Sequence, residues 1–235
     1  MNLENKIVLV TGGSSGIGLD IARLAKSRGA NVIICGRNPE KLEKAAQEFN
    51  LHSYVCDVSD EEQVVRMFAN INRDLGNLDV LINNAGFGYF APLDEIEPSK
   101  FLAVYKTNVL GAALCGREAA KIFKTQKSGN IVNIASTAAL KGFAHGSPYV
   151  ATKFALRGMT ECWRSELRKF NVRVILINPS EVQTDFPVNA GGKERDFNPS
   201  KLIGKDIAHS VICALEMDDR GFIPELTVFA TNPVD

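Results

Sequence analysis

Short, continuously apolar runs alternate with helix-like segments along almost the whole chain. The runs lack the polar alternation of half-exposed strands, which is typical of strands buried on both faces of a sheet. Helical patterns cover residues 17–28, 39–49, 59–75, 100–127 and 148–170. This order predicts one doubly wound α/β domain over residues 1–235, with a parallel sheet, right-handed crossovers and helices on both faces. The seven expected strands are KIVLV, NVIIC, HSYVCD, DVLIN, NIVNIAS, VRVILIN and ELTVFA.

Two helix starts carry recognisable capping signals. Ser59 and Glu62 have the spacing of a capping box for the third helix. In SPYVATKFAL, Ser147 is the expected N-cap and Pro148 the first helical residue, so Tyr149 falls in the opening turn. Tyr149 and the lysine four residues later then share one helix face. Taken alone, this pair favours an ordinary exposed contact, because Tyr-x-x-x-Lys is common by chance.

Composition excludes several classes of function. Lys plus Arg and Asp plus Glu both number 27, so no basic excess favours nucleic acid or an anionic membrane. The five cysteines are far apart and lie mostly in apolar segments, which favours a reducing, cytoplasmic setting. The three histidines show no metal-ligand spacing, and we expect no metal site. The N-terminal sequence shows no signal-peptide pattern, and no run is long enough to span a membrane.

One region has no clear period. Residues 179–200, PSEVQTDFPVNAGGKERDFNPS, are rich in Pro, Gly and charged residues. Long loops inside compact domains are usually functional, so we expect a mobile substrate loop here.

The first apolar run leads directly into TGGSSGIG, Thr11 to Gly18. Glycines allow a tight turn, and the following helix N-terminus offers N–H groups and positive potential to a phosphate. The spacing differs from the common Gly-x-Gly-x-x-Gly fingerprint, and a purely packing role for the glycines remains an alternative. The residues expected to contact a dinucleotide here are Gly12, Ser14, Ser15, Gly16, Ile17 and Gly18.

The end of the second run indicates which dinucleotide is bound. NAD sites place an acidic residue about 20 positions on, whereas an arginine suits the 2′-phosphate of NADP. Here Gly36 stands where the acid is expected, and Arg37 follows it. Ser14 and Ser15 add hydroxyl donors. NADP(H) is therefore the predicted cofactor, although most arginines are simply solvated.

Taken together, the motifs identify a family. They are TGGSSGIG, CDVS, NNAG, TNV, the serine of NIASTAA and YVATK, in this order. The chain resembles the classical short-chain dehydrogenases/reductases over nearly its whole length, which implies a Rossmann-type domain with a seven-stranded sheet. The resemblance implies that Asn108, Ser136, Tyr149 and Lys153 are catalytic. It further implies cofactor contacts from Asp57, Val58, Asn84, Val182 and Thr184, besides Tyr149 and Lys153.

The chemistry of carbonyl reduction fits these residue types. Tyr149 can give a proton to the substrate oxygen, while the Ser136 hydroxyl steadies the charge that develops there. Lys153 is expected to bind the nicotinamide ribose and to bias the phenol toward phenolate. In the family, Asn108 orders a water that links the lysine to solvent. A local backbone-capping role is the alternative for this amide.

Energies define when the tyrosine can act. Lowering a tyrosine pKa by about 3 units requires about 4 kcal/mol, and an exposed i, i+4 pair supplies only about 0.2–0.5 kcal/mol. A cation about 5 Å away in a partly dry site supplies roughly 3 kcal/mol. We therefore expect the pKa of Tyr149 to fall only in a dry site beside an oxidised cofactor.

The chain also departs from the family. Pro179-Ser180 stands where Pro-Gly is usual, which makes Val182 and Thr184 less certain contacts. The C-terminal ELTVFATNPVD lacks the Gly-Gly common in 3-oxoacyl-carrier-protein reductases. Four loop phenylalanines suggest a partly apolar substrate, although some of them are equally compatible with the core. They are Phe87, Phe90, Phe143 and Phe186.

The leading interpretation is an NADP(H)-dependent oxidoreductase that interconverts a small-molecule carbonyl and a secondary alcohol. The alternatives are a 3-oxoacyl-carrier-protein reductase-like activity, a catalytically weak NADP-binding sensor and an assembly protein. The two longest helices carry apolar residues on more than one face, and with the family resemblance this predicts a homodimer or homotetramer.

Overall fold

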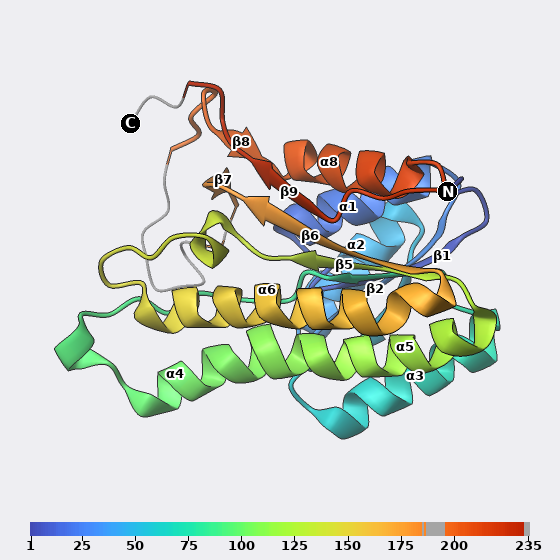
Figure 1. The fold of residues 1–235 in the computed structure, drawn as a ribbon, viewed down its shortest axis with the longest axis horizontal. Helices are drawn as coiled ribbons and strands as arrows, with labels where there is room; N and C mark the ends of the chain where they lie inside the picture. Colours follow the sequence, from blue (N-terminus) through green and yellow to red (C-terminus); the bar gives the residue numbers. More distant parts are fainter. Residues whose placement is uncertain (185, 187–195, 233–235) are drawn as a thin grey trace.

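The computed structural model describes residues 1–184, 186 and 196–232. A seven-stranded sheet forms its centre, with strand order β3-β2-β1-β4-β5-β6-β9 and every neighbouring pair parallel. This confirms the predicted Rossmann-type sheet, which Figure 1 shows between two layers of helices. The strands are β1 (Ile7–Thr11), β2 (Asn31–Gly36), β3 (His52–Val55), β4 (Val80–Asn83), β5 (Gly129–Ile134), β6 (Val172–Pro179) and β9 (Glu225–Val228).

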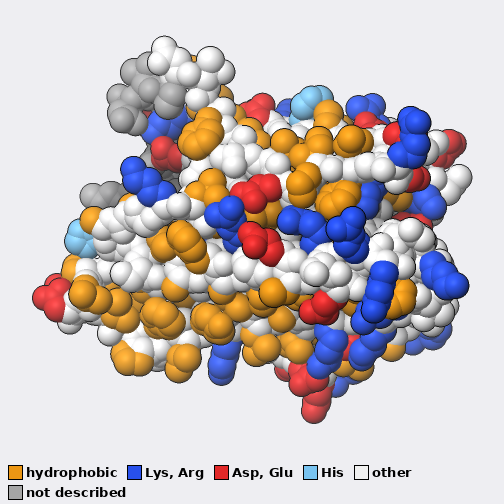
Figure 2. All heavy atoms as spheres, viewed as in Figure 1, with side chains coloured by type: hydrophobic (Ala, Val, Ile, Leu, Met, Phe, Trp, Pro, Cys, Tyr) orange, Lys and Arg blue, Asp and Glu red, His pale blue; other side chains and the backbone are white. Residues whose placement is uncertain are grey.

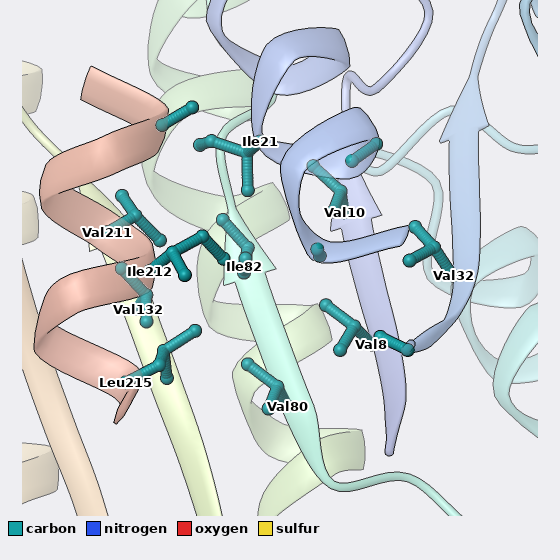
Figure 3. Packing of buried hydrophobic residues seen from close by; sticks show 14 of the residues in the cluster. Val8, Val10, Ile21, Val32, Val80, Ile82, Val132, Val211, Ile212 and Leu215 are labelled. Carbon is teal, nitrogen blue, oxygen red and sulfur yellow. The ribbon is translucent and has the colours of Figure 1, made fainter. Parts of the chain in front are cut away.

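Each face of the sheet has its own core. In β1, Val8 and Val10 point to one face and Ile7 and Leu9 to the other, so both faces are apolar. Figure 3 shows the first face, where strand valines and isoleucines meet Ile21 and residues of the last helix. Helices α1 (Gly16–Ser27), α2 (Pro39–Phe49) and α8 (Gly204–Glu216) cover that face, and α3 (Glu61–Leu75), α5 (Ala112–Gln126) and α6 (Ser147–Leu167) cover the other.

The long helix predicted over residues 100–127 is three consecutive segments. Helix α4 (Pro98–Tyr105) leads into a π-helical segment, η2 (Lys106–Gly111), and then into α5. Asn108 lies within the π-helical segment. Single π turns inside helices are frequent at functional sites, and a periodicity of 3.6 residues gives no warning of them. Short 3-10 turns add η1 (Leu93–Glu95), η3 (Thr137–Ala139) and η4 (Arg168–Phe170).

Both predicted caps are wrong in detail. Helix α3 begins at Glu61 with Asp60 as its N-cap, because the Ser59 hydroxyl donates to the Asp57 carboxylate (2.8 Å) instead. The Asp60 carboxylate accepts from the Gln63 backbone N–H (3.1 Å). Helix α6 includes Ser147, and its N-cap is Gly146 without a side-chain bond. Tyr149 still lies in the first turn.

Part of the region expected to be a loop contains regular structure. Within residues 179–200, the short strand β7 (Val182–Gln183) pairs in parallel with β8 (Leu202–Ile203). A strand of only two residues is too short to recognise in a sequence. Residues 185 and 187–195 lie outside the described residues, so the mobile substrate loop stays a prediction.

Candidate active site

The candidate site lies where the order of the sheet reverses. Strand β1 has β2 on one side and β4 on the other, so the connections after β1 and β4 leave in opposite directions. In open α/β sheets, ligands bind at this switch point, outside the carboxyl ends of the strands. The glycine turn (residues 12–15) follows β1, and the NNAG motif begins at the end of β4.

The glycine turn leaves donors available for an anion. Gly12 and Gly16 have φ values of 64° and 54°, which a side chain rarely permits. Ser15 caps α1 without a side-chain hydrogen bond, and the first turn of α1 contains no acidic residue. The N–H groups of that turn therefore remain available, as a bound phosphate requires. The Ile17 side chain packs partly buried against the core, and its backbone N–H lies in the first turn of α1.

Asn84 braces this turn from the neighbouring strand end. Its amide nitrogen donates to the carbonyls of Thr11 (3.0 Å) and Gly12 (3.2 Å). The Thr11 hydroxyl accepts from the backbone N–H groups of Asn84 and Ala85, each at 3.0 Å. A Cβ on Gly18 would collide with the Asn84 amide. Asn84 thus holds the turn, while its predicted contact with a ribose remains untested.

Ser14 and Arg37 lie near the end of β2. A Cβ placed on Gly36 would be 3.5 Å from the Ser14 hydroxyl, so this hydroxyl adjoins the position where an acidic side chain is expected in NAD sites. The exposed Arg37 guanidinium lies 6.0 Å from the centre of the Phe87 ring. A hydroxyl and a cation therefore flank the position where an NAD-specific carboxylate would stand.

Asp57 and Val58, the residues expected beside an adenine, follow β3. The Asp57 carboxylate accepts from the Ser59 backbone N–H (2.9 Å) and hydroxyl (2.8 Å). Val58 is buried against Gly111, where an added Cβ would be 2.7 Å from the valine methyl group. Both residues shape the connection after β3.

Tyr149, Lys153 and Ser136 are brought together by α6 and the end of β5. The Lys153 ammonium lies 5.6 Å from the centre of the Tyr149 ring and donates to the Ile134 carbonyl (3.0 Å). Ser136 follows β5, and its Oγ accepts from the Ala138 backbone N–H (3.1 Å). Tyr149 and Lys153 are both buried, so they do not form the ordinary exposed helix pair that was the alternative interpretation.

Burial moves the two pKa values in opposite directions. It raises the pKa of Tyr149 to about 12, with a smaller opposing effect of the Ser136 hydroxyl. Burial lowers the pKa of Lys153 to about 8, because the charged ammonium loses solvation. Among the chain's own groups, burial therefore has the largest effect on the pKa of Tyr149. The bias toward phenolate beside an oxidised cofactor stays a prediction. A neutral phenol suits a proton donor.

Asn108 bonds the backbone of Phe87, which is 21 residues away along the chain, and not the local backbone of its own helix. Its amide oxygen accepts from the Phe87 backbone N–H (3.0 Å), and its amide nitrogen donates to the Phe87 carbonyl (2.9 Å). The same nitrogen donates to the Thr152 hydroxyl (3.1 Å), which in turn donates to the Tyr149 carbonyl (2.7 Å). Asn108 therefore joins the loop after β4 to the helix that carries Tyr149.

Thr152 is a site residue that the sequence analysis missed. Its side chain is fully buried between the π-helical segment and α6. The available signal was a hydroxyl residue beside the motif lysine and three positions after Tyr149, a spacing at which threonine bonds the preceding helical turn.

Thr184 and Ser180 can now be placed. A Cβ on Gly16 would lie 3.4 Å from the Thr184 methyl group, so Thr184 adjoins the glycine turn. Val182 pairs with Leu202 in the two-stranded sheet. Ser180, where the family has glycine, donates its N–H to the Val228 carbonyl (2.8 Å) and has no positive φ. Its side chain therefore imposes no backbone strain.

Two of the four loop phenylalanines, Phe90 and Phe186, lie against Tyr149, and a third, Phe143, extends this cluster from Phe90. The rings of Phe90 and Phe186 each lie edge-on to the tyrosine ring, with centroid distances of 5.5 Å. Phe143 lies 6.1 Å from Phe90. We call Phe90, Phe143 and Phe186 the aromatic collar. Phe87 instead lies near Arg37.

Within the described ranges, no three His, Cys, Asp or Glu side chains are grouped as a metal ion would require. No helix in the same ranges is both long and apolar enough to cross a membrane.

Comparison with known proteins decides the family. The sequence profile of the short chain dehydrogenases matches residues 6–194. The chain belongs to the short-chain dehydrogenase family. An uncharacterised oxidoreductase of Staphylococcus aureus strain MW2 is 32% identical over 232 residues, covering 96% of this chain and 97% of that protein. A similar oxidoreductase of Staphylococcus saprophyticus is 29% identical, covering 97% and 98%.

Solved structures match this short-chain dehydrogenase over almost its entire length. An alcohol dehydrogenase of Thermococcus sibiricus, complexed with 5-hydroxy-NADP, superposes with a TM-score of 0.90 at 27% identity, covering 99% of this chain and 100% of that one. A serine dehydrogenase complexed with NADP+ gives 0.89 at 28% identity, covering 97% and 99%. A metagenomic short-chain oxidoreductase in complex with NADP gives 0.86 at 31%, covering 99% and 100%.

Proposed function

We propose that this chain is an NADP(H)-dependent oxidoreductase that interconverts a carbonyl and a secondary alcohol, with Tyr149 as acid/base. The observation that carries the proposal is the buried Tyr149–Lys153 pair beside Ser136 at the switch point of the sheet. NADP compounds in three similar solved structures support the cofactor assignment.

The residues present fit a phosphorylated dinucleotide. The uncapped N-terminus of α1 would hold the pyrophosphate, and Ser14 and Arg37 would hold the 2′-phosphate. Thr184, beside Gly16, would approach the nicotinamide end of the same molecule. When bound, the reduced nicotinamide supplies the hydride.

The chain's own groups manage the proton and the charge. In the reduction, the carbonyl carbon receives the hydride and its oxygen receives the Tyr149 proton, so the carbonyl is reduced as the dinucleotide is oxidised. The Ser136 hydroxyl steadies the oxygen while its charge develops. Lys153 holds its ammonium near the phenol ring, where its positive charge would stabilise the phenolate that remains after proton transfer. Solvent then returns the proton to Tyr149.

A turnover assay tests this proposal. Purified protein is mixed with NADPH and a panel of ketones and aldehydes, and NADPH oxidation is followed by its absorbance. We expect at least one carbonyl to be reduced by the parent protein and not by Tyr149→Phe. Tight NADPH binding without reduction of any carbonyl would favour the sensor alternative. Selective reduction of 3-oxoacyl thioesters would favour the acyl-carrier alternative.

The proposal includes self-association and a reducing compartment. Figure 2 shows apolar side chains gathered over the face formed by α4, α5 and α6. Four of them are 41–56% exposed, namely Leu102, Tyr105, Leu110 and Phe154. We propose that this face packs against a second copy in a homodimer or homotetramer.

The five free cysteines support a cytoplasmic location, and the balanced charge supports a small-molecule partner rather than nucleic acid or membrane.

Light scattering at micromolar concentration checks the assembly. We expect a mass at least twice the 25.6 kDa of one chain. The double variant Leu102→Lys/Phe154→Lys places charge on the apolar face and should shift the mass toward one chain. A parent protein that scatters as a single chain would contradict the proposal.

A further inference from the structure

The aromatic collar narrows the substrate class. It encloses the phenol that must reach the substrate oxygen, because Phe90 and Phe186 each place a ring 5.5 Å from the Tyr149 ring at an interplanar angle of 60°. Any carbonyl that accepts the Tyr149 proton therefore carries its substituents along these rings. The side chains immediately around such a carbonyl are therefore aromatic.

The collar is built into the backbone around it. Gly88 lacks a Cβ that would come within 2.8 Å of the Phe90 ring and 3.1 Å of the Phe186 ring. Gly146 likewise makes room for the Phe143 ring, which a Cβ would approach to 2.6 Å. The Ala91 backbone N–H donates to the His145 carbonyl (2.9 Å) and ties the two loops that carry Phe90 and Phe143. The rings are thus positioned before any ligand arrives.

Part of the Phe90 and Phe143 ring surface is exposed on the outer side of the collar. Phe90 is 39% exposed and Phe143 is 52% exposed, although both belong to the same aromatic cluster. Their planes are tilted by 41°, so the two rings present surfaces of different orientation. A flat ring placed there gains edge-to-face contacts in addition to the burial that an alkyl chain also gains.

We infer that the preferred substrates are aryl carbonyl compounds, whose ring lies against Phe90 and Phe143 while the carbonyl oxygen meets Tyr149 and Ser136. This inference rests on the proposed function and specifies its substrate. Phe90 and Phe143 are the residues that determine the specificity.

Two methyl ketones with a six-carbon substituent provide the test. The parent protein and variants are assayed with NADPH and either methyl phenyl ketone or methyl hexyl ketone, and the ratio of the two kcat/KM values is measured. Phe90→Leu and Phe143→Leu should each lower the phenyl-to-hexyl ratio about three- to tenfold, the loss expected for one aromatic pair. Comparing variants with the parent cancels the different intrinsic reactivity of the two ketones.

Phe229→Leu is the matched control, since this ring is 64% exposed and follows β9 outside the collar. Its ratio should equal that of the parent. An unchanged ratio in both collar variants, with unfolding midpoints like the parent's, would overturn the inference. So would reduction of other carbonyls but of neither methyl ketone. If no carbonyl is reduced at all, the proposed function fails together with it.

Discussion

The glycine turn after β1 and the first turns of α6 lie at the same edge of the sheet but are built in opposite ways. The turn is held by backbone groups and the Asn84 amide, and it leaves the N–H donors at the start of α1 available for a ligand. The start of α6 is held by side chains, and its two titratable groups are buried with pKa values displaced by burial. The glycine turn is therefore ready to bind an anion. At the start of α6, burial disfavours the charged forms of Tyr149 and Lys153.

The largest expected effect breaks the chemistry while sparing the glycine turn. Tyr149→Phe removes only the phenol oxygen, so the rate of carbonyl reduction should fall about 10²–10⁴-fold, the scale of general acid catalysis. NADPH should bind as before, because the turn and Arg37 are unchanged. Steady-state rates and fluorescence titration of NADPH measure the two quantities. Near-parental turnover with hydride transfer rate-limiting would refute the role of Tyr149.

The converse variant changes only the site expected to bind the 2′-phosphate. Arg37→Ala should remove a charge-assisted contact of about 1.5–3 kcal/mol, which corresponds to a roughly ten- to hundredfold loss of preference for NADPH over NADH. Dissociation constants for both cofactors provide the check, and NADH is the internal control because it lacks the 2′-phosphate. A parent protein that binds both equally would contradict the assignment.

The pH dependence sharpens the contrast within α6. Because burial lowers the pKa of Lys153 to about 8, its charge is lost as the pH rises through that value, whereas the phenol of Tyr149, with a pKa of about 12, stays protonated. The kcat/KM for reduction should therefore fall about tenfold per pH unit above pH 8. Lys153→Met should be slower and should lack this limb. The same limb in the variant would assign it to another group.

Stability should follow the same group with a defined sign. The unfolded chain holds the Lys153 proton up to its ordinary pKa of 10.5, whereas the folded chain releases it near 8. The unfolded state therefore binds more protons between these values, and this group adds stability as the pH rises across the window. Below pH 8 the fold bears the full cost of burying this ammonium, and that cost disappears as the pH rises through the window.

The smallest expected effect concerns Thr152, which links the loop after β4 to α6. Thr152→Val leaves the Asn108 amide and the Tyr149 carbonyl without this partner, at about 1–3 kcal/mol of unfolding free energy. We expect kcat to fall several-fold while KM for NADPH stays unchanged, because Tyr149 loses its alignment. Urea unfolding and steady-state kinetics measure both effects.

Thr160 offers a matched control on the same helix. It accepts from Asn133 (2.7 Å) and donates to the Leu156 carbonyl (2.7 Å), the same pattern deeper in the core. Thr160→Val should lower stability without changing kcat per folded molecule, and Thr152→Ser should restore activity. If both valine variants affect only stability, Thr152 is a structural residue and has no positioning role.

Local pattern was sufficient for most of the fold. Apolar runs placed all seven strands of the main sheet, because burial on both faces leaves a continuous signature. The order of the motifs also brought Ser136, Tyr149 and Lys153 to one place. The capping of α3 was not predictable, since the choice between Ser59 and Asp60 depended on whether Asp57 took the serine hydroxyl.

The sequence by itself determined the doubly wound parallel sheet, the glycine turn and the spacing of the tyrosine and lysine on one helix. Each depends on residues close along the chain or on periodicity, which local sterics and burial enforce. Only the tertiary structure decided that the phenol pKa rises, that Asn108 bonds Thr152, and that Phe90 and Phe186 lie against Tyr149 with Phe143 beside Phe90. These depend on desolvation and on contacts between distant segments, and a linear pattern contains neither.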